Sequence, residues 1–158
     1  MNKHTPRVDV IIEVPRGSFV KRGSTGNIDF ISPLPCPFNY GSVPAFIGLE
    51  GDLLDALVLG PRLPVGSKIT VHVWGAVGMT DRGLYDDKLI CSQKPITPWQ
   101  QRLIVWFFRF YAKAKSLLNL YRGRSTCNRC EGWGNAEDAL KRATPRTAIT
   151  WTGPIVPF

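Results

Sequence analysis

The chain has 158 residues, of which 44% are hydrophobic and 11% aromatic, so it can bury a sizeable core and is not expected to be disordered. This length predicts one domain that covers residues 1–158. The formal net charge of +8 predicts an anionic partner such as phosphate, nucleic acid or an anionic surface.

Short segments rich in β-branched or other apolar residues, separated by turns, predict several strands in the first part of the chain. We expect strands at residues 8–14, 19–21, 28–31, 53–59 and 68–77 and in a short segment that ends at Cys91. Residues 32–44 contain four Pro, and we expect an ordered loop there because Cys, Phe and Tyr accompany them. This part of the chain therefore predicts a small, turn-rich sheet.

Residues 98–118 have the apolar spacing of a helix that begins at Thr97 or Pro98. One apolar stripe is expected to pack against the core, at positions 103, 106, 107, 110, 114, 117 and 118. The cations that interrupt this segment exclude a membrane span, and they are Arg109, Lys113 and Lys115. We expect an amphipathic helix here and no membrane partner for the protein.

The last part of the chain predicts a second, shorter helix, which runs from Asn135, a good N-cap, through Ala143. Strands followed by helices are typical of an α+β domain, in which the helices lie on a small sheet or barrel.

Half of the 20 Lys and Arg residues lie between Arg102 and Arg146, and we expect them to form a solvated basic face. An RNA-binding face stays open as an alternative, although no aromatic-interleaved RNA motif supports it. The polar N-terminus lacks the apolar stretch of a signal peptide, which predicts a cytoplasmic protein with reduced thiols. For Cys127 and Cys130 we therefore favour a free thiol pair or a surface disulfide over half of a zinc site.

Half of the 12 acidic residues lie in two short segments, at Glu50, Asp52, Asp55, Asp81, Asp86 and Asp87. Clustered carboxylates repel one another unless a cation lies among them, and carboxylate oxygens are ligands that Mg²⁺ prefers. Lys88 follows the second segment and could bind a phosphate oxygen next to the metal. The acidic segments therefore suggest hydrolysis of a phosphate substrate by metal-activated water. The alternative is that they are acidic turns with ordinary salt bridges.

These segments, with others in the same order, resemble the soluble family I inorganic pyrophosphatases over most of the chain. The resemblance rests on the single residue Lys21 and on Ile12-Glu13-Val-Pro15, Pro37-Phe-Asn39-Tyr40-Gly41, Glu50-Gly-Asp52-Leu-Leu-Asp55, Met79-Thr-Asp81, Asp86-Asp-Lys88, Phe107-Phe108-Arg-Phe-Tyr111 and Glu131-Gly-Trp133-Gly-Asn135-Ala-Glu137. Each motif is weak alone, and their order and spacing together carry the resemblance.

The resemblance implies a five-stranded, OB-like β-barrel with two flanking C-terminal helices, and a homo-oligomer that in bacterial members is often a hexamer. It implies Mg²⁺-dependent hydrolysis of inorganic diphosphate to two phosphates. The implied metal ligands are Glu50, Asp55, Asp81 and Asp86. Asp52 would be the general base and Glu13 would belong to the outer metal and water network. The phosphates would be held by Lys21, Tyr40, Lys88 and Tyr111, and Asp87 receives no role.

The sequence departs from the family pattern in its cationic groups. A substrate-binding Arg is expected near Ile28, but no Arg lies between Arg22 and Arg62. Ala112 stands where a Lys is expected after Tyr111. Since a bidentate Arg–phosphate contact is strong and directional, a second interpretation stays open. In it the chain is a pyrophosphatase-like protein with weak or no turnover that binds a partner through its basic face.

Overall fold

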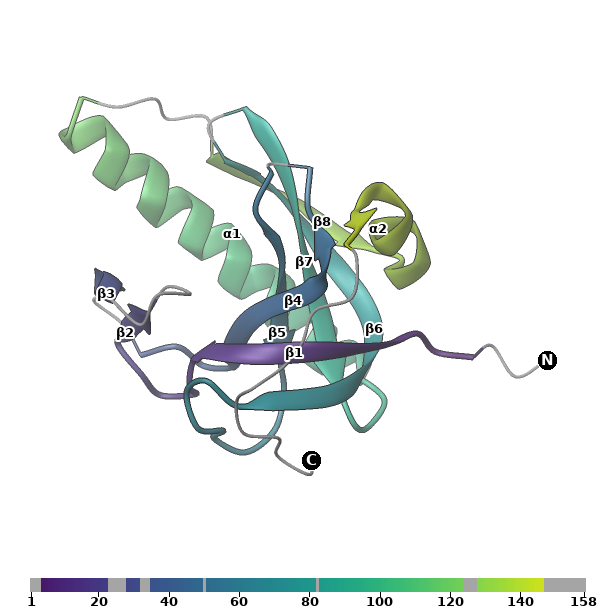
Figure 1. The fold of residues 1–158 in the computed structure, drawn as a ribbon. Coiled ribbons are helices and arrows are strands. Elements are labelled where there is room, and N and C mark those ends of the chain that lie inside the picture. The colour runs from purple at the N-terminus through teal and green to yellow at the C-terminus, as the bar shows by residue number, and fades with distance from the viewer. Residues whose placement is uncertain are drawn as a thin grey trace.

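The computed structural model describes residues 4–22, 28–31, 35–49, 51–81, 83–123 and 128–146. In chain order these residues form β1 (Arg7–Val14), β2 (Val20–Arg22), β3 (Ile28–Ile31), β4 (Asn39–Ile47), β5 (Leu53–Val58), β6 (Lys68–Asp81), β7 (Leu84–Ser92), α1 (Pro98–Tyr121), β8 (Asn128–Gly134), α2 (Ala136–Arg142) and β9 (Thr144–Pro145) (Figure 1).

Five strands are hydrogen-bonded in a closed ring, in the order β1-β4-β5-β7-β6 and back to β1. All of these pairings are antiparallel except that of β5 with β7, which is parallel. β8 pairs with β6 and β9 with β4, while β2 and β3 form a separate hairpin. The ring and the two helices confirm the predicted α+β fold with five strands and flanking helices.

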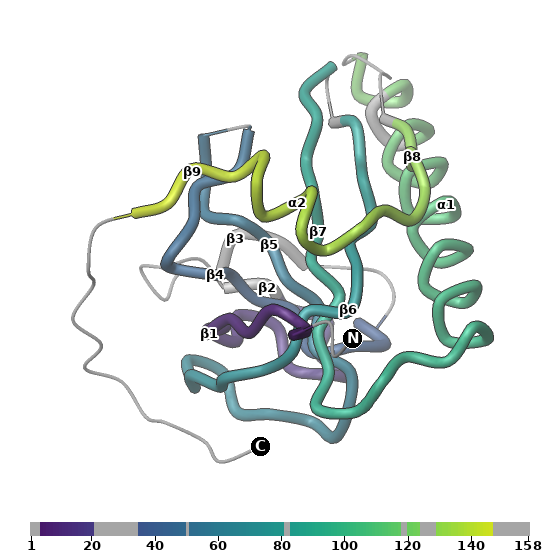
Figure 2. Tube along the Cα trace, turned by 90° about the vertical axis from the view of Figure 1, so that its right-hand side faces the viewer, coloured from purple at the N-terminus to yellow at the C-terminus, as the bar shows by residue number. Residues whose placement is uncertain are grey.

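The core lies in two parts, one enclosed by the ring and one between the ring and α1. β1 alternates buried and partly exposed residues, as a strand does when one face meets the core. α2 packs its small residues on the first part, through Ala136, Ala139 and Ala143. α1 covers the second part, where Ile104 and Phe108 meet side chains of β5, β6 and β7. Figure 2 shows α1 and α2 on different sides of the strands.

The face of α1 that meets the core differs from the predicted one. Ile104, Phe108 and Ala112 are 1%, 3% and 4% exposed. The predicted core stripe instead faces solvent at Leu103, Trp106, Phe110 and Leu117, which are 45% to 69% exposed. Of the predicted stripe, Phe107 does pack against the core. The rest of the prediction was wrong because α1 carries two apolar stripes. The stripe that docks contains the small Ala112, which lets the helix approach the sheet closely.

Both helix starts follow the capping rules. The Thr97 amide donates to Gln100 Oε1 at 2.9 Å, and the Gln100 amide donates to Thr97 Oγ1 at 3.2 Å, which is a capping box with Pro98 in the first turn. Asn135 Oδ1 accepts a hydrogen bond from the Glu137 amide at 2.7 Å. The expected starts of α1 and α2 are therefore confirmed.

Among the described residues, neither helix combines the length and apolar character that a membrane crossing requires.

Three strands were not predicted from the sequence, namely β4, β8 and the two-residue β9. β4 occupies the second half of the segment expected to be a loop, and Pro44 falls where its pairing with β5 changes register, between Val43 and Ile47. Such an irregularity tolerates a residue without an amide hydrogen. β8, with two Gly in seven residues, has no strong strand preference of its own. Its pairing with β6 imposes the extended conformation.

Candidate active site

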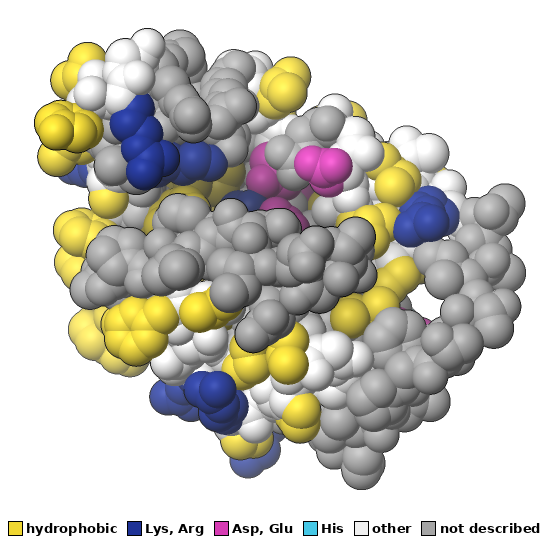
Figure 3. Space-filling view, turned by 60° about the vertical axis from the view of Figure 1, so that its left-hand side comes forward, with side chains coloured by type: hydrophobic (Ala, Val, Ile, Leu, Met, Phe, Trp, Pro, Cys, Tyr) yellow, Lys and Arg dark blue, Asp and Glu magenta, His cyan; other side chains and the backbone are white. Residues whose placement is uncertain are grey.

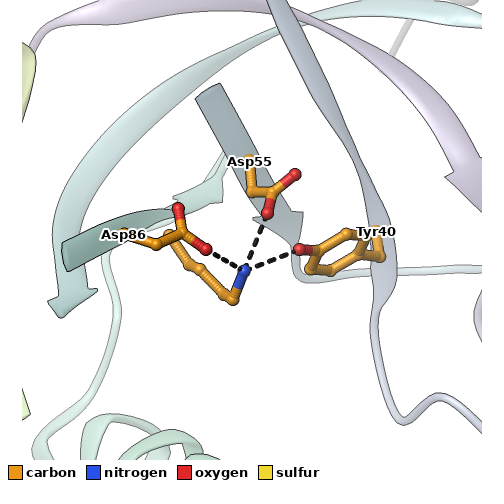
Figure 4. Close-up of polar contacts among 4 residues, drawn as sticks. Tyr40, Asp55 and Asp86 are labelled. Atoms are coloured by element: carbon orange, nitrogen blue, oxygen red, sulfur yellow. Dashed lines mark hydrogen bonds and ion pairs between the residues drawn. The ribbon is translucent and has the colours of Figure 1, made fainter. Parts of the chain in front are cut away.

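The ammonium group of Lys88 lies at the centre of a buried polar cluster (Figure 4). Lys88 Nζ is 2.7 Å from Asp55 Oδ2 and 2.8 Å from Asp86 Oδ2, and it donates a hydrogen bond to the Tyr40 hydroxyl at 3.0 Å. The side chains of Lys88, Asp55 and Asp86 are only 11%, 15% and 7% exposed. Four residues of the predicted site therefore meet in one place. We call these four residues, Tyr40, Asp55, Asp86 and Lys88, the Lys88 cluster.

The sheet brings these four residues together. Asp55 of β5 is the register partner of Lys88 across the parallel pairing with β7. Asp86 and Lys88 lie two residues apart on β7, so their side chains point to the same face. Tyr40 comes from β4, the other neighbour of β5. Figure 3 shows acidic side chains gathered in a hollow of the surface with basic side chains beside them.

Charge and burial fix the protonation states in the Lys88 cluster. Burial alone lowers the pKa of Lys88, but Tyr40, Asp55 and Asp86 outweigh it and raise that pKa well above its ordinary value. Burial, followed by the charge of Asp55, raises the pKa of Tyr40 well above its ordinary value. Lys88 is therefore a cation and Tyr40 a neutral phenol at neutral pH.

The donor chemistry of the cluster fits Mg²⁺. Asp55 and Asp86 supply hard carboxylate oxygens in a largely buried position. Asp81 lies two residues along β6 from Met79, and Met79 is the register partner of Asp86. No group of three or more potential ligands converges among the side chains that the structure describes. Two of the four predicted ligands fall outside that set, namely Glu50 and the side chain of Asp81.

The remaining predicted site residues lie apart from the Lys88 cluster or outside the described side chains. Asp52 is exposed in the bend that precedes β5, and Glu13 is half-buried in β1. Tyr111 is 37% exposed on α1 and stacks on Phe107 with ring centroids 6.3 Å apart. Lys21 belongs to β2, but its side chain is not described. Cys127 also lies outside the described residues, whereas Cys130 is a free thiol.

Asp87 lies on the opposite face of β7 and has a partner that the sequence did not reveal. Its side chain is 4% exposed and receives two hydrogen bonds from Arg142 of α2, both 2.9 Å long. The same guanidinium lies over the Tyr85 ring, 5.4 Å from its centroid. The alternation of side chains along β7 could have placed Asp87 away from Asp86 and Lys88, but no local signal identifies Arg142. This pair holds α2 against β7.

Replacing Arg142 with Met leaves the buried Asp87 carboxylate without its cation. We expect a loss of about 2 kcal/mol in the free energy of unfolding, below the full cost of breaking a buried pair because the Arg142 side chain is 37% exposed. Urea denaturation measures this loss of unfolding free energy. The matched control is Arg129→Met, since the Arg129–Glu131 pair is exposed and should cost less than about 0.5 kcal/mol. Equal losses in the two variants would contradict a structural role for the Asp87–Arg142 pair.

Comparison with known proteins places this arrangement in a family. Residues 10–144 match the inorganic pyrophosphatase family. The inorganic pyrophosphatase of Methanosarcina acetivorans is 30% identical over 87% of this chain and 90% of its own length. That of Gluconobacter oxydans is 37% identical over 53% of each chain. The crystal structure of the Thermus thermophilus inorganic pyrophosphatase superposes with a TM-score of 0.71, 27% identity and 90% coverage of both chains. The chain therefore belongs to the inorganic pyrophosphatase family.

Proposed function

We propose that this protein hydrolyses inorganic pyrophosphate to two phosphates in a Mg²⁺-dependent reaction. The observation that carries the proposal is the Lys88 cluster, in which two buried carboxylates, a lysine and a tyrosine converge from three strands. A metal-dependent phosphohydrolase requires metal ligands next to groups that bind phosphate, and the carboxylates, the lysine and the tyrosine of the cluster supply both. Membership of the inorganic pyrophosphatase family supports inorganic pyrophosphate as the substrate.

In this proposal Asp55 and Asp86, together with Glu50 and Asp81, hold Mg²⁺, and Glu13 belongs to the water network outside them. Magnesium, when bound, neutralises charge on the phosphate oxygens and acidifies water. Asp52 accepts the proton of the attacking water as general base. Its exposed position in the bend before β5 leaves it open to solvent and substrate.

The chain holds the phosphates through the N–H and O–H donors of Lys21, Tyr40, Lys88 and Tyr111. A lysine ammonium has three donors, and those of Lys88 are directed at Asp55, Asp86 and Tyr40. Lys88 can therefore bind a phosphate oxygen only when one of these partners gives up its hydrogen bond. A cation that takes over a carboxylate permits this exchange, so we expect metal and substrate to bind cooperatively.

The test is phosphate release from pyrophosphate with Mg²⁺, by the wild type and by Asp52→Asn. We expect the variant to lose at least about 100-fold in kcat, the usual contribution of a general base, and chelation of Mg²⁺ to abolish wild-type turnover. The matched control is Asp138→Asn, an exposed acid in the first turn of α2, which should keep full activity. If the wild type releases phosphate no faster than Asp52→Asn, the proposed enzyme activity is contradicted. The interpretation as a binding module with weak or no turnover then stands.

The proposal includes a single domain over residues 1–158 and a cytoplasmic homo-oligomer, hexameric by resemblance. The family match over residues 10–144 supports the single domain. Light scattering of the purified protein gives the number of subunits, and a monomer at micromolar concentration would contradict the oligomer.

A further inference from the structure

Three aromatic rings form a row between the segment before β4 and the middle of α1, and we call Phe38, Phe107 and Tyr111 the aromatic row. The Phe38 and Phe107 rings meet edge to face, with centroids 5.4 Å apart and an interplanar angle of 87°. The Phe107 and Tyr111 rings stack, with centroids 6.3 Å apart and an interplanar angle of 22°. Both arrangements are favourable between aromatic side chains, so the row ties α1 to the start of β4.

One end of the aromatic row is close in the chain to the Lys88 cluster. Phe38 is two residues before Tyr40, and both side chains pack against the part of the core that α1 covers. The Tyr40 hydroxyl accepts a hydrogen bond from Lys88 Nζ, which also lies 5.5 Å from the centroid of the Tyr40 ring (Figure 4). The segment around the start of β4 therefore takes part both in the Lys88 cluster and in the aromatic row.

The other end of the row is Tyr111, whose ring orientation the stack restricts. Tyr111 is 37% exposed, and a side chain at the surface can exchange rotamers and so turn its hydroxyl in several directions. Phe107 lies one helical turn before it, at a spacing at which two side chains of a helix meet. Phe107 is itself held by two edge-to-face contacts, one with Phe38 and one with Phe108, whose ring centroid is 5.3 Å away. A ring fixed in this way favours one orientation of the tyrosine stacked on it.

We propose that Phe38 and Phe107 are positioning residues, which hold Tyr111 so that its hydroxyl meets pyrophosphate bound at the Lys88 cluster. This inference rests on the proposed function, in which Tyr111 holds a phosphate group. A phenol has a single O–H donor, so the direction of its hydrogen bond depends on the orientation of the ring. Neither phenylalanine has a polar atom that could contact a phosphate, and both therefore act through the tyrosine. A ring that is already ordered spares the substrate the entropy cost of ordering it on binding.

The experiment is a double-mutant cycle on pyrophosphate hydrolysis with Mg²⁺, in the full-length protein, with Phe107→Leu, Tyr111→Phe and the two changes combined. We expect each single change to raise KM for pyrophosphate by about three- to tenfold, the range that one aromatic pair or one hydrogen bond supplies, and to change kcat less. The double variant should be no worse than the more affected single variant, because Phe107 acts through the Tyr111 hydroxyl. Phe107→Tyr keeps a ring for the stack and should keep the wild-type KM. Phe38→Leu should raise KM in the same direction.

The matched control is Phe46→Leu, the same change in a partly buried phenylalanine that packs against the other part of the core. It should keep the wild-type KM. An equal rise in KM in Phe46→Leu and Phe107→Leu would mean that any loosening of the fold has this effect, and it would overturn the proposal. Changes in KM that simply multiply in the double variant would overturn it as well, since Phe107 and Tyr111 would then act independently.

The same cycle separates the role of the aromatic row from the proposed function. Turnover by the wild type, with an unchanged KM in Phe107→Leu, contradicts the role of the row alone. If the wild type shows no turnover, the proposed function fails, and calorimetric titration with pyrophosphate and Mg²⁺ then gives Kd in place of KM for the same variants. A rise in Kd that the double variant does not increase further supports the row. Independent effects on Kd, or no binding by the wild type, overturn it.

Discussion

Lys88→Met is expected to destabilise the metal-free protein by about 3–5 kcal/mol, because it removes a buried cation that contacts both Asp55 and Asp86. The two carboxylates are largely buried and would lose the ammonium group that lies between them. Methionine keeps a similar length and apolar stem, so the loss reports charge and hydrogen bonds rather than volume. Urea denaturation in the presence of a chelator measures it.

Magnesium should restore part of this loss. If Asp55 and Asp86 bind Mg²⁺, the free energy of unfolding of Lys88→Met rises more steeply with Mg²⁺ than that of the wild type, since the ion then replaces the missing cation. Turnover should stay at least about 100-fold below wild type even at saturating Mg²⁺, because a phosphate-binding donor is lost. Lys68→Met is the control, since its ion pair with Asp9 is partly exposed. An identical Mg²⁺ response in wild type and Lys88→Met would count against metal binding by these carboxylates.

Gly41→Ala is expected to cost more than about 4 kcal/mol, or to prevent folding. A Cβ at this position would overlap the backbone carbonyl oxygen of Ile11 and lie 2.8 Å from its carbonyl carbon. Ile11 and Gly41 belong to β1 and β4, which pair side by side in the ring. Two backbones cannot separate at one point without loss of the neighbouring ladder hydrogen bonds, so no local adjustment relieves the overlap.

The control for this change is Gly48→Ala, just beyond the end of β4. A Cβ there meets nothing closer than Asp52 O at 3.7 Å, which is an ordinary contact, and the free energy of unfolding should change by less than about 1 kcal/mol. Thermal unfolding of both variants gives the comparison. Similar melting temperatures for Gly41→Ala and the wild type would mean that β1 and β4 do not approach as closely as described.

The sequence predicted the elements whose signals are local. β-branched runs predicted β1 and part of β6, and an apolar run predicted β5. Asn135 predicted the start of α2 because a side-chain cap is a contact between near neighbours. β8 was missed because its pairing with β6, and not its own composition, makes it a strand. The buried face of α1 was predicted wrongly because two apolar stripes compete along it, and the shape of the sheet decides between them.

The Lys88 cluster was predictable only through the family resemblance. Spacing alone left acidic turns as an alternative, stronger for any single residue than for the whole set. The resemblance selected Tyr40, Asp55, Asp86 and Lys88, which the structure brings together. The roles of these residues stay predictions. The Asp87–Arg142 pair joins positions 55 residues apart and depends on where α2 lies over β7. No pattern in the sequence carries that information.

The parallel pairing of β5 with β7 also has a consequence for how the protein folds. Asp55 and Lys88 are 33 residues apart in the chain and meet only when β7 has returned from its hairpin with β6 and aligned beside β5. Pairings of such high contact order form late, because the chain must close a long loop before any contact compensates for the lost entropy. α1 and the β6–β7 hairpin can form earlier from local contacts. We therefore expect refolding protein to gain helix before it gains the ability to bind pyrophosphate.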